Sequence, residues 1–566
     1  MKRIIALVLV VIMAFVTITG CEAKDTQPKV QSGSKDVTGQ GEKSAPVKIT
    51  LMINESDSEW NLADTPNFKK IQEIFLEKFN VQYELETALG KEFATTVTTR
   101  FASGDQLPDM INYRYPAEKL ADLYKNNLII KLNDLVDKNG PEVKKIFKQK
   151  PFLAVANGDR EGNILRIPAQ IMENPQHRIT VLNIRNDWLK KVGMNELKTP
   201  DDLYTALKAF QDKDVNENGK RDEILTGFGN GAFNTVLGSA FGVKFMDGAS
   251  ISWYAESDGK IYHTFLTPQT KDYVSFMNKL YSEKLLDDSY MNQTGEQFNE
   301  KLHNNKIAGR PGAWWDSVLM SMAVKDKGFD CEHIPLMPPL SATGKPTVHL
   351  KDLPGYGGYM ITKDCKNPDA AMKLINWGYT TEGSIQNYYG ESTVTGGDYY
   401  IKATPYEGLS FPEYQMEYTE KGKKAIAEEP LLWTKMGWNG EYTTKLLIAN
   451  ADAIAYEFFT AFGVEKCGLA ADIQFNLKGL NDAEFTYGIT AVNFVSPTSE
   501  QTSQWEDFSD MWIYMDEQIS KFITGVEPIS KWDDFVAQCN KMGIDEATSI
   551  KQEQYDAYKK VMSSLK

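Results

Sequence analysis

The segment Val47-Lys-Ile-Thr-Leu-Met-Ile-Asn54 places an apolar side chain at every second position, which is the period of a β-strand with one buried face. Thr65-Pro66 follows as a helix cap with proline at the first helical position, and the segment 68–79 carries its apolar residues on one helical face. Segments 81–85 and 108–112 return to the strand pattern. Strands that alternate with helices in this way predict an α/β fold with a mainly parallel sheet.

The same alternation resumes in the middle of the chain. Segment 178–183 has strand character, and Thr199-Pro200-Asp201-Asp202 caps a further helix. Segments 272–283, 367–379 and 442–462 are predicted to be helices. Because 566 residues are too many for one hydrophobic core, we predict two α/β lobes with additional helices.

The N-terminus has the pattern of an export signal. Lys2 and Arg3 precede the apolar run 4–16, which is shorter than the roughly 20 residues that span a bilayer. Ile18-Thr-Gly-Cys21 resembles the bacterial lipobox, in which the cysteine is acylated, with palmitate among the attached chains, and becomes the new N-terminus. Residues 22–46 are polar, as in a flexible tether. We therefore predict a signal peptide at 1–20 and a lipidated N-terminus with its tether at 21–46.

The overall charge argues against nucleic acid as a partner. Lys and Arg number 62 and Asp and Glu number 77, which gives a net charge of −15 and repels phosphate backbones. The 5 histidines lack metal-ligand spacing, so a histidine-built zinc or iron centre is not expected. Four cysteines follow the lipobox, and the spacing chooses neither among their three possible pairings nor between bridges and free thiols: Cys331, Cys365, Cys467 and Cys539.

One internal segment has the ligand pattern of a calcium-binding loop, Asp214-Val-Asn-Glu-Asn-Gly-Lys-Arg-Asp-Glu223. Oxygen-bearing side chains occupy its first, third and fifth positions, glycine its sixth, and acids its ninth and tenth, which suits a cation that takes about six to eight oxygen ligands. The twelfth position is Leu225 rather than the glutamate of an EF-hand, so two acids would replace that carboxylate. A polar turn between two helices is the alternative. The predicted ligands of a structural Ca²⁺ are Asp214, Asn216, Asn218, the carbonyl of Lys220, Asp222 and Glu223.

Aromatic residues indicate a saccharide ligand. The sequence lacks the GxSxG, HExxH and GxxxxGK[ST] signatures of common enzymes. Flat indole faces pack against sugar rings, and amide and charged side chains bind the hydroxyl groups. Core packing is the alternative for each tryptophan. The predicted ligand-binding residues are Trp60, Asn112, Arg114, Gln170, Asn230, Trp314, Trp315, Trp433 and Trp438.

An ordered set of segments resembles the extracellular solute-binding proteins of ABC importers, in the large lipoprotein branch that includes binders of alginate oligosaccharides. The set lies behind the lipobox and comprises Ala102-Ser-Gly-Asp-Gln-Leu-Pro-Asp109, Arg185-Asn-Asp-Trp188 through Gly193 with Thr199-Pro200, the calcium-like loop, Lys279-Leu-Tyr-Ser-Glu-Lys-Leu-Leu286, Cys365-Lys-Asn-Pro-Asp-Ala-Ala371 and Phe522-Ile-Thr-Gly525.

The resemblance implies a helix-rich, two-lobed periplasmic-binding-protein-like fold of type II, with crossing hinge segments. Lobe one would hold residues 47–170 and 326–405, and lobe two residues 171–325 and 406–566. It further implies a monomer on the extracellular face of the cell membrane, in a Gram-positive bacterium, which captures an oligosaccharide by hinge closure, delivers it to an ABC permease and is no enzyme.

Two other functions stay open at the level of the sequence. A surface glycoside hydrolase could place two acids in the same cleft, because the spacing of catalytic carboxylates is spatial. An adhesive or sensory lipoprotein would need no transporter. The identity and charge of the sugar do not follow from the resemblance, although Arg114, Arg178 and Arg310 could bind an acidic one.

Overall fold

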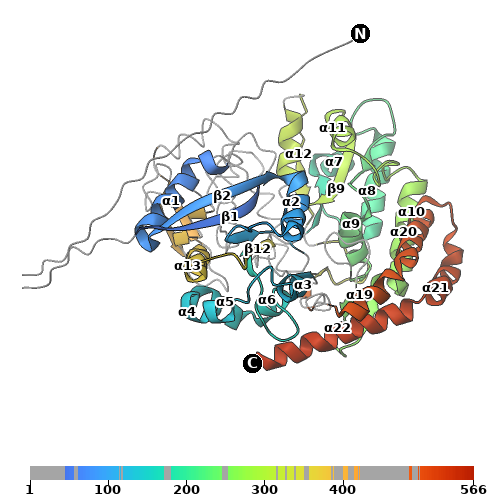
Figure 1. Ribbon diagram of the computed structural model, residues 1–566. Helices are drawn as coiled ribbons and strands as arrows, with labels where there is room; N and C mark the ends of the chain where they lie inside the picture. Colours follow the sequence, from blue (N-terminus) through green and yellow to red (C-terminus); the bar gives the residue numbers. More distant parts are fainter. Residues whose placement is uncertain are drawn as a thin grey trace, which may run out of the picture. The chain divides into compact units, whose positions relative to one another are not determined.

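Strand β1 (Val47–Glu55) lies inside a five-stranded sheet, sheet one, in the order β2-β1-β3-β12-β4. It pairs in parallel with β2 (Val81–Leu89) and with β3 (Met110–Asn112). Strand β12 (Tyr356–Ile361) is antiparallel to β3 and to β4 (Ile167–Gln170), so the sheet is mixed rather than mainly parallel. The computed structural model, shown in Figure 1, describes residues 45–55, 62–113, 115, 119–170, 180–244, 253–313, 316–325, 328–329, 331–336, 339–349, 356–380, 382–383, 386–387, 400–405, 414–418, 420, 484–486, 495 and 497–565.

Both faces of sheet one are covered. Ile49 and Leu51 pack in one core with α1 (Pro66–Phe79) and α13 (Pro368–Gly378). Met52 points to the opposite face, as neighbours on a strand do, and packs with α2 (Gly90–Ser103). The prediction of one buried face on β1 was therefore wrong, because helices cover both faces of the sheet.

The predicted helix caps of both halves are present. The hydroxyl of Thr65 accepts the N–H of Phe68 at the start of α1. At α8 (Pro200–Lys213) the Thr199 hydroxyl accepts the Asp202 N–H at 3.1 Å, and the Asp202 carboxylate accepts the Thr199 N–H at 2.9 Å. These reciprocal bonds satisfy amide groups that the first helical turn leaves without partners.

A second sheet, sheet two, has the order β10-β5-β9-β6. Strand β9 (Ile307–Gly312) is antiparallel to β5 (Val181–Arg185) and parallel to β6 (Ile224–Leu225). Strand β10 (His333–Pro335) is antiparallel to β5. The sheet shares a core with α7 (Asn186–Val192), α8, α10 (Pro268–Ser282), α20 (Ser509–Thr524) and α21 (Trp532–Lys541).

The two sheets have separate hydrophobic cores, which is what two lobes require. The cores at sheet one take their buried residues from 49–169 and 359–379, whereas the core at sheet two takes them from 182–340 and 508–550. Strand β10 falls in the segment predicted for lobe one, yet it pairs in sheet two. The exact lobe limits stay a prediction.

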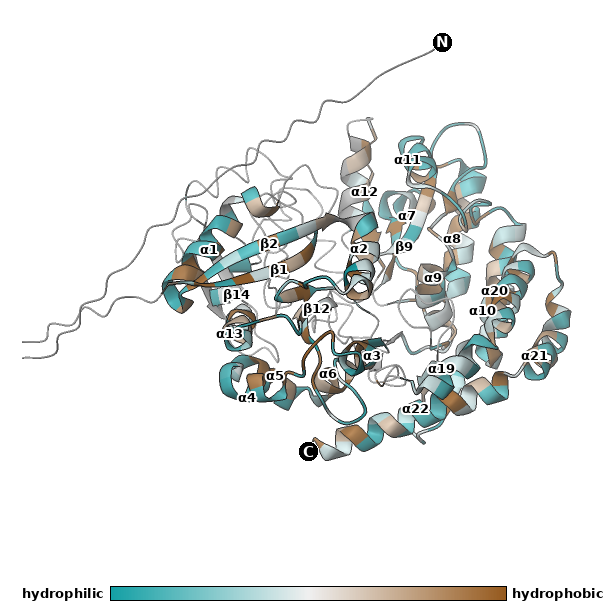
Figure 2. Cartoon of the chain, viewed as in Figure 1, coloured by the Kyte–Doolittle hydropathy of each residue, from teal (hydrophilic) through white to brown (hydrophobic). Residues whose placement is uncertain are grey.

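The C-terminal helix α22 (Ile544–Ser564) contacts both lobes. Its first half contributes Ile544, Ala547 and Ile550 to the core of sheet two. Its second half packs through Tyr558 and Val561 against α6 (Pro151–Ala156) and its surroundings. Figure 2 shows teal and brown residues side by side along α22, as expected for a helix that buries only part of its surface.

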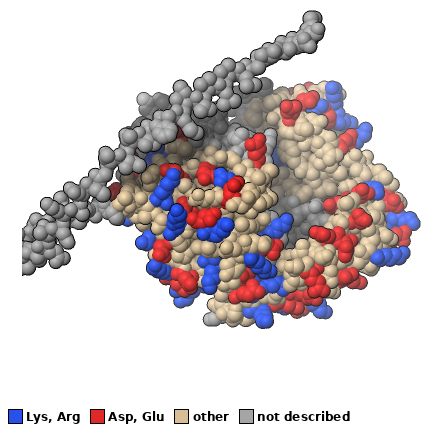
Figure 3. Space-filling model, in the orientation of Figure 1, with Lys and Arg blue, Asp and Glu red and all other residues tan. Residues whose placement is uncertain are grey.

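Two further findings concern the surface and the cysteines. Positive and negative side chains are interspersed over the face shown in Figure 3. Within the part of the chain that the structure describes, no helix combines the length and the apolar character that crossing a membrane requires. Cys365 and Cys539 are free thiols, and the thiol of Cys331 donates to the side-chain oxygen of Asn305 at 3.6 Å. Cys467, Cys21 and the predicted helix 442–462 lie outside the described residues.

Candidate functional site

The structure places only part of the predicted ligand set. Asn112 and Asn230 are described with their side chains, and Gln170 is described as the last residue of β4. The remaining members lie outside the described residues, as does Arg178: Trp60, Arg114, Trp314, Trp315, Trp433 and Trp438. That these nine residues form one ligand-binding site therefore stays a prediction.

Asn112 ends β3 and ties this strand to β12. Its side-chain oxygen accepts the N–H of Gly358 at 3.2 Å, and only 8 % of the residue is exposed. The neighbouring Gly357 has a φ of +65°, and a Cβ there would lie 3.0 Å from the same oxygen. The oxygen of Asn112 thus supports a glycine position within β12 that has no room for a side chain.

Asn230 follows β6 and begins the short helix α9 (Asn230–Phe233). The hydroxyl of Tyr290 donates a 2.6 Å hydrogen bond to its side-chain oxygen. The carbonyl of Tyr290 also accepts the N–H of Gly229 at 2.7 Å. Because β6 and β9 are parallel, the turn after β6 and the residues after Gly312 lie at the same edge of sheet two. This edge is where ligands bind in many open α/β sheets.

A buried ionic network lies beneath the turn. Lys301 pairs with the Asp287 carboxylate at 2.6 Å, and the Thr226 hydroxyl donates to the same oxygen at 2.6 Å. Gln293 donates to the Thr226 hydroxyl at 2.8 Å and to the carbonyl of Gly227. Burial alone would raise the pKa of Asp287, but the hydrogen bonds from Lys301, Thr226 and Ser289 outweigh burial and lower it. The network therefore fixes the backbone of the turn from below.

The fixed turn exposes an aromatic ring. Phe228 is 49 % exposed, and its ring centroid lies 5.2 Å from that of Phe298. The Arg310 guanidinium lies 5.3 Å from the Phe228 ring and pairs with Asp316 at 3.0 Å. Of the three arginines proposed for an acidic sugar, only Arg310 is described, and its charge is balanced by the Asp316 carboxylate.

The predicted calcium loop is folded around its own side chains. Asp214 accepts the N–H of Asn218 at 3.1 Å and the N–H of Gly219 at 2.8 Å. The amides of Asn216 and Asn218 both donate to the Asp222 carboxylate, and Lys306 lies 3.2 Å from its other oxygen. The described residues contain no group of three or more His, Cys, Asp or Glu side chains that could hold a metal ion.

Nevertheless, the Glu223 carboxylate of this loop would be better satisfied by a bound cation than by the groups that now surround it. Glu223 is fully buried, and its Oε2 atom has no hydrogen-bond partner. Burial raises the pKa of Glu223, and the nearby Asp222 and Asp214 carboxylates raise it further. A buried carboxylate oxygen without a partner is costly, and a divalent cation would compensate this cost. The residues present therefore fit a calcium ion.

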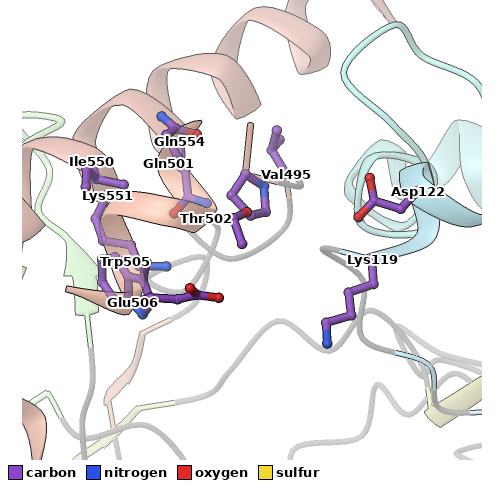
Figure 4. Close-up of a pocket in the computed structure, with 11 residues that line it drawn as sticks. Lys119, Asp122, Val495, Gln501, Thr502, Trp505, Glu506, Ile550, Lys551 and Gln554 are labelled. Carbon is purple, nitrogen blue, oxygen red and sulfur yellow. The ribbon is translucent and has the colours of Figure 1, made fainter. Parts of the chain in front are cut away.

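A pocket of about 400 Å³ lies between lobe one and the C-terminal helices (Figure 4). Lobe one contributes Lys119 and, from α3 (Leu120–Lys125), Asp122. The other wall comes from α19 (Ser499–Glu506), α22 and the residues before α19, namely Val495, Pro497, Gln501, Thr502, Trp505, Glu506, Ile550, Lys551 and Gln554. Of the predicted residues that the structure describes, Asn112, Gln170 and Asn230, none lines this pocket.

The sequence reasoning thus missed Phe228 and the pocket. Phe228 stands between two glycines shortly after β6, and this position could have marked it as a ring presented by a turn. Trp505 stands inside a helix, where helical spacing alone favours core packing. No local signal joins Trp505 to Lys119, because their proximity depends on the tertiary fold.

Two lobes with separate cores, together with a pocket lined by both, define a two-lobed binding protein. Residues 63–385 match the family of bacterial extracellular solute-binding proteins, and the chain belongs to this family. The predictions of the family and of the two-lobed α/β fold are therefore confirmed. Such proteins bind a solute without converting it, so the hydrolase alternative is set aside.

Relatives and solved structures agree with this assignment. The fructooligosaccharide ABC transporter substrate-binding protein FusA of Streptococcus pneumoniae serotype 4 is 25 % identical over 528 residues, which cover 90 % of this chain and 91 % of FusA. The polygalacturonan/rhamnogalacturonan-binding protein YtcQ of Bacillus subtilis is 29 % identical over 163 residues, which cover 28 % of this chain and 30 % of YtcQ.

Two solved structures show the same fold. An extracellular solute-binding protein from Bifidobacterium longum subsp. infantis has a TM-score of 0.68 at 20 % identity, and the match covers 91 % of this chain and 98 % of that one. The alginate-binding protein AlgQ2 has a TM-score of 0.64 at 18 % identity, with 91 % and 99 % coverage. At these identities the likeness concerns the fold alone.

Proposed function

We propose that this protein captures an oligosaccharide between its lobes and delivers it to the permease of an ABC importer. The observation that carries the proposal is the pair of separate cores, because lobes that fold around their own cores can move relative to each other as rigid bodies. A ligand that contacts both lobes then stabilises the closed arrangement. Full-length similarity to FusA supports a saccharide as the ligand class.

The edge of sheet two supplies the chemistry for such a ligand. Phe228 offers an exposed apolar ring, and Asn230 offers an amide whose oxygen is fixed by Tyr290. Since Asp316 balances Arg310, this edge suits a neutral sugar better than an acidic one. The tryptophans predicted from the sequence would add further apolar faces.

A structural calcium ion belongs to the same proposal. The loop 214–223 would hold the ion through Asp214, Asn216, Asn218, the Lys220 carbonyl, Asp222 and Glu223, and Asp222 would release Lys306 in doing so. A solved FusA structure is described as an EF-hand mutant, which supports calcium in a relative. When bound, the ion would stabilise the loop and take no part in ligand chemistry.

The membrane anchor is proposed from the sequence. Acylation of Cys21 would tether the mature protein to the outer face of the cell membrane, and the polar segment 22–46 would let it reorient toward the permease.

Calorimetric titration against a glycan panel tests the proposal. The panel contains kestose, nystose, maltotriose, xylotriose and trigalacturonate, and each titrated sample is then analysed for cleavage products. We expect saturable binding of at least one neutral member and recovery of that sugar uncut. Absence of binding across the panel, or the appearance of shorter products, would contradict the proposal.

A further inference from the structure

We propose that the pocket between α3, α19 and α22 is a binding subsite for one neutral sugar unit. This inference rests on the proposed function and assigns part of the ligand to particular residues. The volume of about 400 Å³ lies in the range of small-molecule sites and admits a single pyranose or furanose ring with its hydroxyl groups.

Gln554 carries a buried side-chain oxygen that lacks a hydrogen-bond partner, and this is the strongest indication of a ligand in the pocket. The residue is 4 % exposed, lines the pocket, and its Oε1 atom has no hydrogen-bond partner. A buried amide oxygen without a partner costs free energy, which a ligand hydroxyl would recover by donating to it. Gln501 on the same wall differs, because Arg160 donates to its oxygen at 2.7 Å and its own amide donates to Glu553 at 2.9 Å.

These bonds of Gln501 also make the pocket wall rigid. Arg160 belongs to lobe one, so the contact with Gln501 joins the two lobes beside the pocket. A wall that is already ordered loses little conformational freedom when a ligand binds.

Trp505 supplies an aromatic surface. Its indole stacks on Trp512 with 5.2 Å between the ring centroids, and Trp253 packs edge-on against it at 6.2 Å, so its position is fixed by the core of lobe two. The Lys551 ammonium lies 4.5 Å from the Trp505 ring centroid. Such a contact is weak at a partly exposed site, so a sugar ring can take the place of the ammonium and receive a hydrogen bond from it.

The charges of the described lining residues favour a neutral ligand. Among these residues, Lys119 and Lys551 bring two positive charges, and Asp122 and Glu506 bring two negative ones. Carboxylates and ammonium groups together bind hydroxyl groups both as acceptors and as donors. A uronate would meet two carboxylates in the same pocket, which costs free energy unless they are protonated or move away.

Gln554→Met tests the inference with two readouts of opposite sign. The substitution removes the buried oxygen at nearly constant volume, so the unliganded protein should keep or raise its melting temperature. The affinity for the neutral sugar that wild type binds should fall about tenfold or more, because a hydrogen bond to the ligand is lost. Thr502→Trp, which places a bulky ring at an exposed position of the same wall, should also weaken binding.

Gln552→Met is the matched control on the same helix. Gln552 accepts the N–H of Ile261 at 3.0 Å and donates to the carbonyl of Gly259 at 3.0 Å, away from the pocket. This variant should have a lower melting temperature than wild type and bind the sugar as wild type does.

If wild type binds a sugar and Gln554→Met and Thr502→Trp bind it equally well, the subsite is refuted while the proposed function stands. If trigalacturonate binds more tightly than every neutral sugar, the neutral preference is refuted; if wild type binds no member of the panel, the proposed function and this inference fail together.

Discussion

The hydroxyl of Tyr290 donates a 2.6 Å hydrogen bond to the side-chain oxygen of Asn230. Tyr290 is fully buried, whereas Asn230 stands at the carboxyl edge of sheet two, so the bond connects the core of lobe two with the turn that presents Phe228. The side-chain NH₂ of Asn230 is then oriented by its own carbonyl and is available as a donor with a defined direction.

Tyr290→Phe should therefore weaken sugar binding, although Tyr290 itself is buried in the core of lobe two. The ring keeps its packing against Phe233, but the Asn230 amide loses its fixed orientation. We expect a loss of about 1 kcal/mol in the free energy of unfolding and a several-fold loss in affinity, measured by chemical denaturation and calorimetry.

Tyr273→Phe is the control for this prediction. The Tyr273 hydroxyl donates to the side-chain oxygen of Asn234 at 2.8 Å, in the core of the same lobe. It should reduce stability by a similar amount and leave the affinity unchanged. An equal loss of affinity in both variants would show that Tyr290→Phe acts by destabilising the lobe in general and not through the orientation of Asn230.

Phe228→Ala should reduce affinity without a large change in stability. The exposed ring makes limited contacts with Phe298 and Arg310, whereas a sugar ring on its open face would bury apolar area worth about 1–2 kcal/mol. Calorimetry should show roughly a tenfold weaker Kd for the alanine variant and near wild-type binding for Phe228→Tyr. Tyr262→Ala, which removes another exposed aromatic ring, should bind as wild type does, and equal losses in both alanine variants would refute the role of Phe228.

The fold could be predicted from the sequence where local signals decide it. Thr199-Pro200-Asp201-Asp202 carries its capping chemistry within four residues, and the structure contains the reciprocal bonds. Strand β12 was not predicted, because its place between β3 and β4 depends on pairing with residues far away along the chain. The alternating pattern of residues 47–54 predicted one buried face, and the burial of Met52 on the other face could not be predicted, since the helix α2 that covers it is a tertiary feature.

The candidate site divides in the same way. The position of Asn230 after a strand end could be predicted from its glycine-rich turn, while its role in ligand binding stays a prediction. The unpaired oxygen of Gln554 could not, because only the packing of α19, α22 and α3 decides whether this amide finds a partner.

Calcium should raise the melting temperature of the wild type, and a chelator should lower it, because the ion binds the native state. Glu223→Gln should abolish this response. In the absence of calcium the variant should be at least as stable as wild type above about pH 4.5, since the raised pKa of Glu223 means that the folded state binds more protons and loses stability as the pH rises.

Glu217→Gln is the control for the calcium prediction. Glu217 lies in the same loop but pairs with Lys191 at 2.9 Å and belongs to no predicted ligand set. It should keep the full calcium response. If neither calcium nor a chelator changes the melting temperature of wild type, the metal assignment is contradicted.

Acid should destabilise lobe two through His263. This imidazole is buried against Trp253 and Trp512, its Nε2 atom has no hydrogen-bond partner, and burial lowers its pKa to about 3. The unfolded chain takes up the proton near pH 6.5, so the unfolded state binds more protons between about pH 6.5 and 3, and stability must fall as the pH decreases through that window. The pKa of the buried His333 is also lowered, by burial and by Arg185, so it acts in the same direction.

His263→Gln should therefore flatten the dependence of unfolding free energy on pH between about 4 and 6, even if it lowers stability at pH 7. Urea denaturation at several pH values measures the slope, which is independent of the packing cost of the substitution. His303→Gln, at an exposed position in the last turn of α11 (Gly295–His303), should leave the slope as in wild type. If His263→Gln does not change the slope, this imidazole takes up its proton over the same pH range in the folded and unfolded states, which contradicts the prediction.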